Sequence, residues 1–231
     1  MRAQQIKLAA LGRLTANIAH EIRNPLSAIR QASQLLGEVN EPGDARLLAM
    51  VEKNVRRIDR IVANVLSLSK RDRVVPQLVG LQSTMPELIA EWRVQAQVQA
   101  DAVTLDFEEH AQIPMVNVDK GHLEEIMWNL IGNGWRHSAQ KSGSVLVTVR
   151  RSVSGRMTVI EVTDDGPGVP TDHRDSIFEP FFSMSGSSGL GLYISRELAE
   201  ANAGTLELTP HAPGAQFRLL LPGNPTESSP Q

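Results

Sequence analysis

The chain has 231 residues, a hydrophobic fraction of 41%, a charged fraction of 21% and a formal net charge of −3 at pH 7. These values are typical of a soluble globular protein with one large or two small domains. The absence of cysteine excludes disulfides and thiolate metal sites. The absence of a basic block argues against nucleic acid as a partner. No apolar run approaches the roughly 18 residues that span a bilayer, so we expect no membrane contact in this chain and a cytoplasmic location for it as given.

Residues from about 3 to 72 contain only helix signals, interrupted by a turn at 40–44. Two helices joined by so short a turn form an antiparallel hairpin. Such a hairpin cannot cover its own apolar face, so we predict a homodimer in which two hairpins pair into a four-helix bundle. Packing of that face against the rest of the chain is the alternative. The apolar stripes, spaced by three and four, are Leu11, Leu14, Ile18, Ile22, Leu26 and Ile29, then Leu47, Val51, Val55, Ile58, Val62 and Val65.

His20 lies about 200° around the first helix from the apolar stripe, at about 100° per residue, and so faces away from the core. Glu21 is adjacent to it, and Asn24 is one turn further on, within reach of a group attached to the imidazole. Pro25 follows and cannot donate a helix hydrogen bond, which predicts a bend just beyond the histidine. Taken alone, a solvated surface histidine is the simpler interpretation.

From residue 74 to 222 strands and helices alternate with hairpins, which indicates helices on one face of a mixed sheet. The fold class is therefore α+β: a helical hairpin followed by an α/β sandwich. Residues 223–231 are predicted to be a disordered tail. We expect the helix at 83–99 to be capped by Ser83 or Thr84, and the helix through 123–131 by Asp119. A further helix is expected at 189–201, and strands at 76–81, 103–107, 115–118, 145–149, 157–162, 205–208 and 216–221.

The helix after Asp119 carries Asn129 and Asn133 on one face, at positions i and i+4. Carboxamide oxygens are hard ligands that suit magnesium, while Arg136 and His137, just beyond, can neutralise phosphate oxygens. Caps near a helix end are the alternative explanation for such asparagines.

Asp164 follows a predicted strand and precedes Gly166 and Gly168. A carboxylate at a strand end, next to glycines that let the backbone come close, suits an exocyclic amine such as that of adenine, although an ordinary Asp-Gly turn is the alternative. The glycines of Ser187-Ser188-Gly189-Leu190-Gly191-Leu192 run into a helix, whose N-terminus can bind phosphate. The segment is not a Walker loop, because the Gly-Lys-Ser/Thr ending is missing.

In this order the segments resemble the catalytic core of bacterial sensor histidine kinases, which join a helical phosphoacceptor domain to a GHKL-type ATP-binding domain. The run 20–25, His-Glu-Ile-Arg-Asn-Pro, resembles the H box, and 129–133 resembles the N box. The runs 164–168, 178–182 and 189–192 resemble the G1, F and G2 boxes. Together the five boxes cover the chain from about 8 to 221. The phrase around His20 is also similar to the sensor kinases that regulate type IV pili.

The resemblance implies that His20 accepts the γ-phosphoryl group of ATP, with Glu21 acting as base or orienting the ring. Asn24 matches the position that orients water when such kinases dephosphorylate their partner. The implied partner is the receiver domain of a response regulator, whose aspartate takes the phosphoryl group from His20.

The resemblance further implies that Asn133 ligates Mg²⁺ with Asn129 nearby, and that Asp164 holds adenine. Arg136 and His137 would face phosphates, as positioning and charge neutralisation for phosphoryl transfer require. A lid between Phe182 and Gly189 would close over the nucleotide. The remaining residues that the boxes assign to ATP are Gly166, Gly168, Phe178, Gly189, Leu190 and Gly191.

Two departures from the family pattern stand out. Ser187 occupies the first position of the G2 box, where a glycine is usual, and the lid at 183–186 is short; both can weaken ATP binding. Trp135 follows Gly134 where a small residue is common, and we expect it to belong to the core rather than to pack beneath the nucleotide.

The alternatives are a GHKL ATPase of the chaperone or topoisomerase kind, and a degenerate dimeric scaffold or response-regulator phosphatase with weak or no kinase activity. Family members usually carry membrane spans upstream, so the chain is interpreted as the cytoplasmic part of an inner-membrane sensor kinase. The expected domains are therefore 1–73 for dimerisation and histidine phosphotransfer, 74–222 for ATP binding, and 223–231 as the tail.

Overall fold

The computed structural model describes residues 22–33, 35, 44–70, 73–108, 115–152, 155–184 and 188–223. The chain divides into two compact units, Met1–Ser69 with Glu179–Gly191, and Lys70–Phe178 with Leu192–Gln231. In the described ranges no helix is both long enough and apolar enough to cross a membrane.

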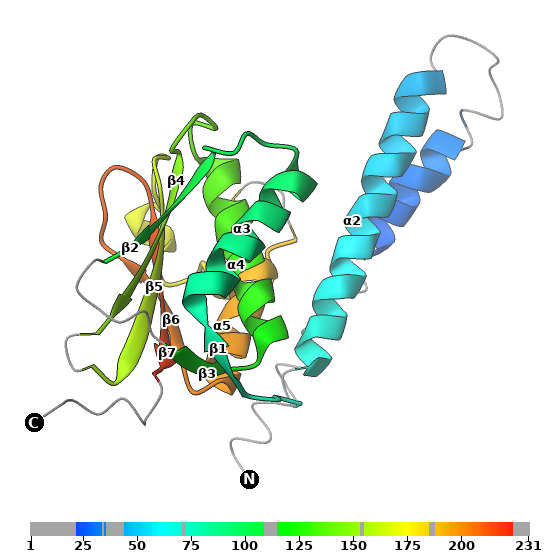
Figure 1. Cartoon of the computed structure of the whole chain (residues 1–231). Helices are drawn as coiled ribbons and strands as arrows, with labels where there is room; N and C mark the ends of the chain where they lie inside the picture. Colours follow the sequence, from blue (N-terminus) through cyan, green and yellow to red (C-terminus); the bar gives the residue numbers. More distant parts are fainter. Residues whose placement is uncertain are drawn as a thin grey trace, which may run out of the picture. The chain divides into compact units, whose positions relative to one another are not determined.

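The helical part of the first unit consists of residues 22–33 and α2 (Asp44–Lys70) (Figure 1). Ile61 is completely buried, although it lies outside the predicted stripe. Val55 and Val62 belong to that stripe, yet each is 43% exposed in the single chain. These exposed valines do not contradict the predicted stripe, because that stripe is expected to be covered by a second hairpin rather than within one chain.

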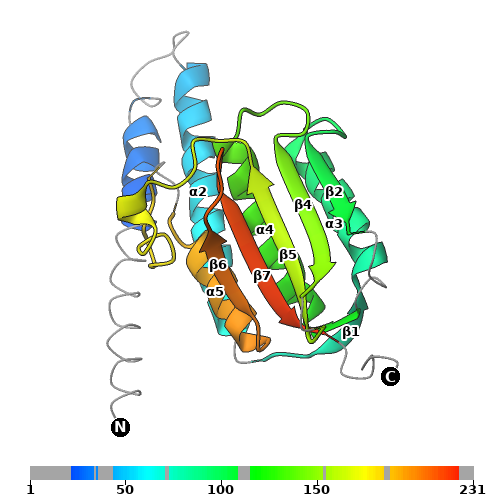
Figure 2. The same ribbon diagram turned by 90° about the vertical axis from the view of Figure 1, so that its left-hand side faces the viewer.

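The second unit is built on a five-stranded sheet with the strand order β2-β4-β5-β7-β6, in which only β2 and β4 run parallel. The helices α3, α4 and α5 lie on one face of this sheet (Figures 1 and 2). In a separate antiparallel pair, β1-β3, Val116 forms an isolated bridge with Gly223, the residue after β7. The predicted sandwich with helices on one face of a mixed sheet is thus confirmed. Its elements are β1 (Gln77–Gly80), α3 (Leu81–Ala96), β2 (Val103–Phe107), β3 (Met115–Val118), α4 (Lys120–His137), β4 (Val145–Arg151), β5 (Met157–Asp164), η1 (Thr171–His173), α5 (Gly191–Ala201), β6 (Thr205–Thr209) and β7 (Gln216–Pro222).

The core lies between the sheet and its three helices, as the alternation of side chains in the strands requires. In β4 and β7 buried and more exposed residues alternate along the strand. The central strand β5 is buried along most of its length, from Thr158 to Val162. The helices contribute fully buried residues such as Leu123, Ile131 and Ile194.

Two helix starts differ from the sequence prediction. α3 begins at Leu81 after Gly80, with no side chain capping it; Ser83 instead donates to the carbonyl of Gly80 at 3.2 Å, so the predicted Ser83 or Thr84 cap is wrong. α5 begins at Gly191, because Gly189 has a φ of +65°, outside the helical region. The cap of α4 is confirmed, since Asp119 Oδ1 accepts from the backbone N–H of His122 at 3.2 Å.

Candidate functional site

Asp164 is the last residue of β5 and is buried, with 6% of its surface exposed. Its Oδ1 accepts hydrogen bonds from the backbone N–H of Gly166 at 2.9 Å and of Ala215 at 3.2 Å. Burial raises the pKa of Asp164, although both hydrogen bonds and the nearby His137 act in the opposite direction. The backbone therefore fixes the orientation of the carboxylate, and its second oxygen, Oδ2, takes no part in these two bonds.

Gly166 brings the turn after β5 against the end of α4. A Cβ added to Gly166 would lie 2.3 Å from the carbonyl oxygen of His137, a distance that real Cβ atoms do not show. Gly168, two residues on, lies against the backbone of Gly214 in the turn before β7. Three backbone segments that are far apart in sequence thus meet around Asp164, and the sequence-predicted residues Asp164, Gly166, Gly168 and His137 come together there.

The C-terminal end of α4 carries the other predicted ligands. Asn129 and Asn133 are half-buried and one turn apart, whereas Arg136 and His137 are exposed. Arg136 Nη1 donates to Asn133 Oδ1 at 2.9 Å, so the guanidinium and the carboxamide lie side by side. Cations in the last turn of a helix are stabilised by its dipole.

Trp135, on the same helix turn, is only half-buried, and its carbonyl accepts from the hydroxyl of Ser138 at 2.9 Å. The expectation that Trp135 belongs to the core is therefore met only in part.

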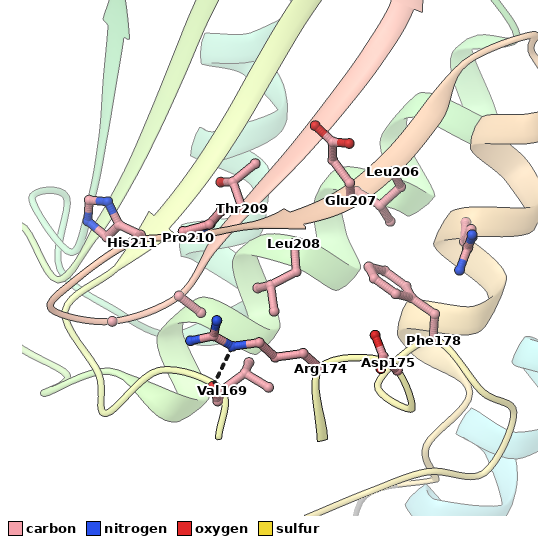
Figure 3. A pocket seen from close by; sticks show the side chains of 13 residues that line it. Val169, Arg174, Asp175, Phe178, Leu206, Glu207, Leu208, Thr209, Pro210 and His211 are labelled. Atoms are coloured by element: carbon pink, nitrogen blue, oxygen red, sulfur yellow. Dashed lines mark hydrogen bonds between the residues drawn. The ribbon is translucent and has the colours of Figure 1, made fainter. Parts of the chain in front are cut away.

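Phe178 takes part in packing against β7 and α5. Its ring meets Phe217 edge-on, with centroids 6.3 Å apart and planes at 89°, and Arg196 lies 5.2 Å from its centroid. It also lines a pocket of about 310 Å³ beside β6, where Arg174 extends past Leu208 (Figure 3). None of the other residues that the sequence assigns to ATP lines this pocket.

In the first unit the F and G2 boxes touch each other. Phe181 donates its backbone N–H to the carbonyl of Gly189 at 3.0 Å, and Leu190 is completely buried. Asn24 is exposed on the helix at 22–33. His20, Glu21 and Ser187 lie outside the described residues.

Ala215 and Gly214 are the residues of this candidate site that the sequence analysis missed. Ala215 holds the carboxylate of Asp164 through its backbone N–H, and such a donor has no side-chain signature. The available signal was the Pro213-Gly214 pair before β7, which marks a turn but not the residue that it contacts.

Two family models match the chain. Residues 10–73 match the His Kinase A (phospho-acceptor) domain, and residues 118–225 match the histidine kinase-, DNA gyrase B-, and HSP90-like ATPase. Sensor protein kinase PilS of Pseudomonas aeruginosa is 41% identical over 215 residues, which are 89% of this chain and 39% of PilS. Sensor histidine kinase ZraS of Escherichia coli is 33% identical over 229 residues, 97% of this chain and 48% of ZraS. The chain thus spans less than half the length of these relatives.

The fold is also that of a solved structure. Histidine kinase ThkA, crystallised in complex with the response regulator protein TrrA, superposes with a TM-score of 0.76 at 20% identity. The match covers 98% of this chain and 66% of the ThkA chain. At this identity the likeness concerns the fold alone.

Proposed function

This chain belongs to the sensor histidine kinases, as the catalytic core of one, and from that premise we propose that it transfers the γ-phosphoryl group of ATP to His20. An imidazole nitrogen of His20 attacks the γ-phosphorus, the bond to the β-phosphate oxygen breaks, and ADP leaves. Glu21 takes the ring proton or orients the ring. The phosphoryl group then passes to an aspartate of a response regulator.

The observation that carries this proposal is the arrangement around Asp164. Oδ1 is held by two backbone N–H groups, so Oδ2 is the oxygen that the amine of adenine would meet. Gly166 and Gly168 let the turn after β5 pack against the backbone of His137 and Gly214. Such a preorganised acceptor suits the amine of a purine base, and it lies within the region that matches the ATPase family.

Magnesium is implied by the family, and the residues at the end of α4 fit it. Asn129 and Asn133 present carboxamide oxygens one turn apart, and Mg²⁺ prefers oxygen ligands and usually completes its shell with water and phosphate. When bound, the ion would neutralise charge on the phosphates. Because Asn133 Oδ1 accepts from Arg136, the guanidinium is within reach of any phosphate that approaches this oxygen.

The exposed apolar side chains of the helical unit support one of the proposed partners, a second copy of the chain. Leu26 is 51% exposed, and Val55 and Val62 are each 43% exposed, in the single chain. These side chains support a homodimer in which two hairpins bury them together. The receiver domain of a response regulator is the proposed acceptor, with Asn24 orienting water when the regulator is dephosphorylated. We place this activity in the cytoplasm, in a protein whose remaining part reaches the inner membrane.

The test is incubation of the chain with γ-labelled ATP and magnesium. We expect label on the wild type that is stable in base and labile in acid, as a phosphohistidine is. His20→Gln removes the acceptor and Asn133→Ala removes a metal ligand, so both variants are expected to lose the label. Asp106→Ala, an exposed aspartate on β2, serves as the control and should label normally.

Nucleotide binding separates the remaining outcomes. Titration with MgADP, followed by calorimetry, is expected to show binding to the wild type and to His20→Gln alike. Binding without labelling of the wild type would contradict the kinase and favour a degenerate scaffold or phosphatase. Acid-stable label would contradict His20 as the acceptor.

A further inference from the structure

The carboxylate of Asp165, next to Asp164, accepts hydrogen bonds from both ends of the connection between α4 and β4. Its Oδ1 accepts from the backbone N–H of Ala139 at 2.9 Å, and its Oδ2 accepts from the hydroxyl of Ser144 at 3.1 Å. Its own N–H donates to the carbonyl of Ser144 at 3.2 Å. Lys141 Nζ lies 3.7 Å from Oδ2 but is 71% exposed, so this ion pair adds little.

The segment that Asp165 holds, residues 138–144, is an irregular turn. Gln140 and Gly143 have positive φ values of 55° and 71°. Ser144 is 1% exposed, and its hydroxyl also accepts from the backbone N–H of Lys141 at 3.0 Å. Asp165 therefore supplies hydrogen bonds at the beginning and at the end of a segment that has no helix or sheet ladder of its own.

This segment begins where α4 ends. Residue 138 follows directly on His137, whose carbonyl lies so close to Gly166 that no side chain fits between them. The turn that carries Asp164, Asp165 and Gly166 thus contacts the end of α4 at Gly166 and the segment after α4 through the side-chain hydrogen bonds of Asp165. Loss of the Asp165 side chain would leave the backbone contact at Gly166 and the backbone hydrogen bond from Asp165 to Ser144, but nothing that holds Ala139.

The charge of Asp165 strengthens these bonds. The hydrogen bond from Ala139 is the main cause that holds the pKa of Asp165 below its ordinary value, so the group is ionised at neutral pH. Hydrogen bonds to an ionised acceptor are stronger than neutral ones. The same charge contributes to the raised pKa of the adjacent Asp164.

We propose that Asp165 is a positioning residue that holds the α4–β4 connection against the turn carrying Asp164, and so sets the affinity of the kinase for ATP. The proposal rests on the proposed function. Asp165 itself does not touch the nucleotide; it keeps the end of α4, with Arg136 and His137, in register with the carboxylate that receives adenine. Removing it should weaken the binding of ATP rather than the chemistry at His20.

The experiment measures the rate of His20 labelling against ATP concentration for the wild type and for Asp165→Ala. We expect the KM for ATP to rise about tenfold while the maximal rate changes less than about threefold. In Asp165→Asn the amide can accept from Ala139 and donate to Ser144, so its KM should return to within about threefold of the wild type. The control Asp106→Ala, on β2, should leave the KM unchanged.

A double-mutant cycle with Ser144→Ala tests the contact itself. Both changes remove the hydrogen bond between Ser144 and Asp165. The KM of the double variant is therefore expected to match that of the worse single variant within about twofold. Fully multiplicative effects would overturn the proposal. So would a lowered melting temperature and a lower maximal rate at unchanged KM, which is the result of a merely structural role.

The two proposals can fail separately. If the wild type labels but Asp165→Ala keeps its KM, only the present inference is wrong. If the wild type does not label, the proposed function is wrong, and titration with MgADP then tests Asp165 alone, with a tenfold weaker affinity of Asp165→Ala expected. An unchanged affinity in that titration would also overturn the inference.

Discussion

Gly214 and Asp164 are packed backbone to backbone: a Cβ on Gly214 would lie 1.7 Å from the carbonyl oxygen of Asp164. Gly214 also has a φ of +91°, a conformation that other residues rarely adopt. The next residue, Ala215, donates its N–H to Asp164 Oδ1. The turn before β7 therefore fixes both the backbone and the carboxylate of the residue proposed to receive adenine.

Gly214→Ala should therefore damage stability and nucleotide binding together. The added methyl group cannot fit, so the turn must move and take the N–H of Ala215 with it. We expect a loss of roughly 2–4 kcal/mol in the free energy of unfolding, measured by urea titration, and a large loss of MgADP affinity. Gly155→Ala is the matched control, since Gly155 has a φ of +68° with nothing within 4 Å of its Cβ position. The control should cost only about 1–2 kcal/mol and keep its affinity; equal losses in both would contradict the steric argument.

Asp164→Asn should separate stability from binding. The amide oxygen can still accept from Gly166 and Ala215, while the cost of burying a charge disappears. We expect the free energy of unfolding at about pH 7 to stay the same or rise by about 1 kcal/mol, and MgADP binding to be lost. A clear fall in stability would show that the charge of Asp164 is compensated.

The difference in unfolding free energy between Asp164→Asn and the wild type should change with pH in one direction. Burial raises the pKa of Asp164 in the folded state, so folding favours the protonated form. The stability from this group is present below the pKa of the unfolded chain and is lost as the pH rises through the folded pKa. The advantage of Asp164→Asn over the wild type should thus grow from about pH 4 to about pH 7. An advantage that is larger at the acid end would contradict the raised pKa.

The sequence singled out several residues that lie together around Asp164, but not the backbone groups that hold them. Asp119 was recognisable as a cap, because an aspartate before a periodic apolar run has a local function. Asp164 was recognisable from its place between a strand and two glycines. The hydrogen bond from Ala215 was not, since the donor belongs to the backbone and lies 51 residues away in sequence. Helix starts were misjudged where a residue's backbone angle decides, as at Gly189.

Glu161 on β5 is another residue whose hydrogen-bond partners lie far away in sequence, and its pKa leads to a prediction. Burial alone would raise its pKa, but hydrogen bonds from Arg150 and Arg218 outweigh burial and hold the pKa below its ordinary value. Stability from such a group is present above the pKa of the unfolded chain and is lost as the pH falls through the folded pKa. Glu161→Gln should cost roughly 1–3 kcal/mol at neutral pH and flatten the fall in stability below about pH 4.

Glu207 provides the control for Glu161. It also pairs with Arg218, at 3.4 Å, but its side chain is 51% exposed, compared with 11% for Glu161. Glu207→Gln should therefore cost less than about 1 kcal/mol in the same urea titrations. Equal costs for the two glutamates would show that burial does not decide the strength of this network.

Asn202 joins the end of α5 to the start of α4 through a buried side chain. Its Oδ1 accepts from the N–H of Asp119 at 2.8 Å, its Nδ2 donates to the carbonyl of Leu198 at 2.7 Å, and Nδ2 lies 3.0 Å from His122 Nδ1. Asp119 in turn accepts from the N–H of Val75 at 2.9 Å, ahead of β1. Asn202→Ala leaves these buried groups without partners, so we expect a loss of roughly 2–4 kcal/mol in unfolding free energy.

The loss in Asn202→Ala should be confined to this end of the unit, because Asn133 and His137 lie at the opposite end of α4. Hydrogen exchange at the amides of Asp119 and Val75 should accelerate, while MgADP affinity stays within about threefold of the wild type. Asn117→Ala, on the exposed side of β3, is the control and should change neither quantity. Affinity that falls together with stability would mean that the network at the start of α4 is coupled to the proposed nucleotide site along the helix. Fast exchange at Val75 alone would instead show that Asp119 keeps its place without Asn202.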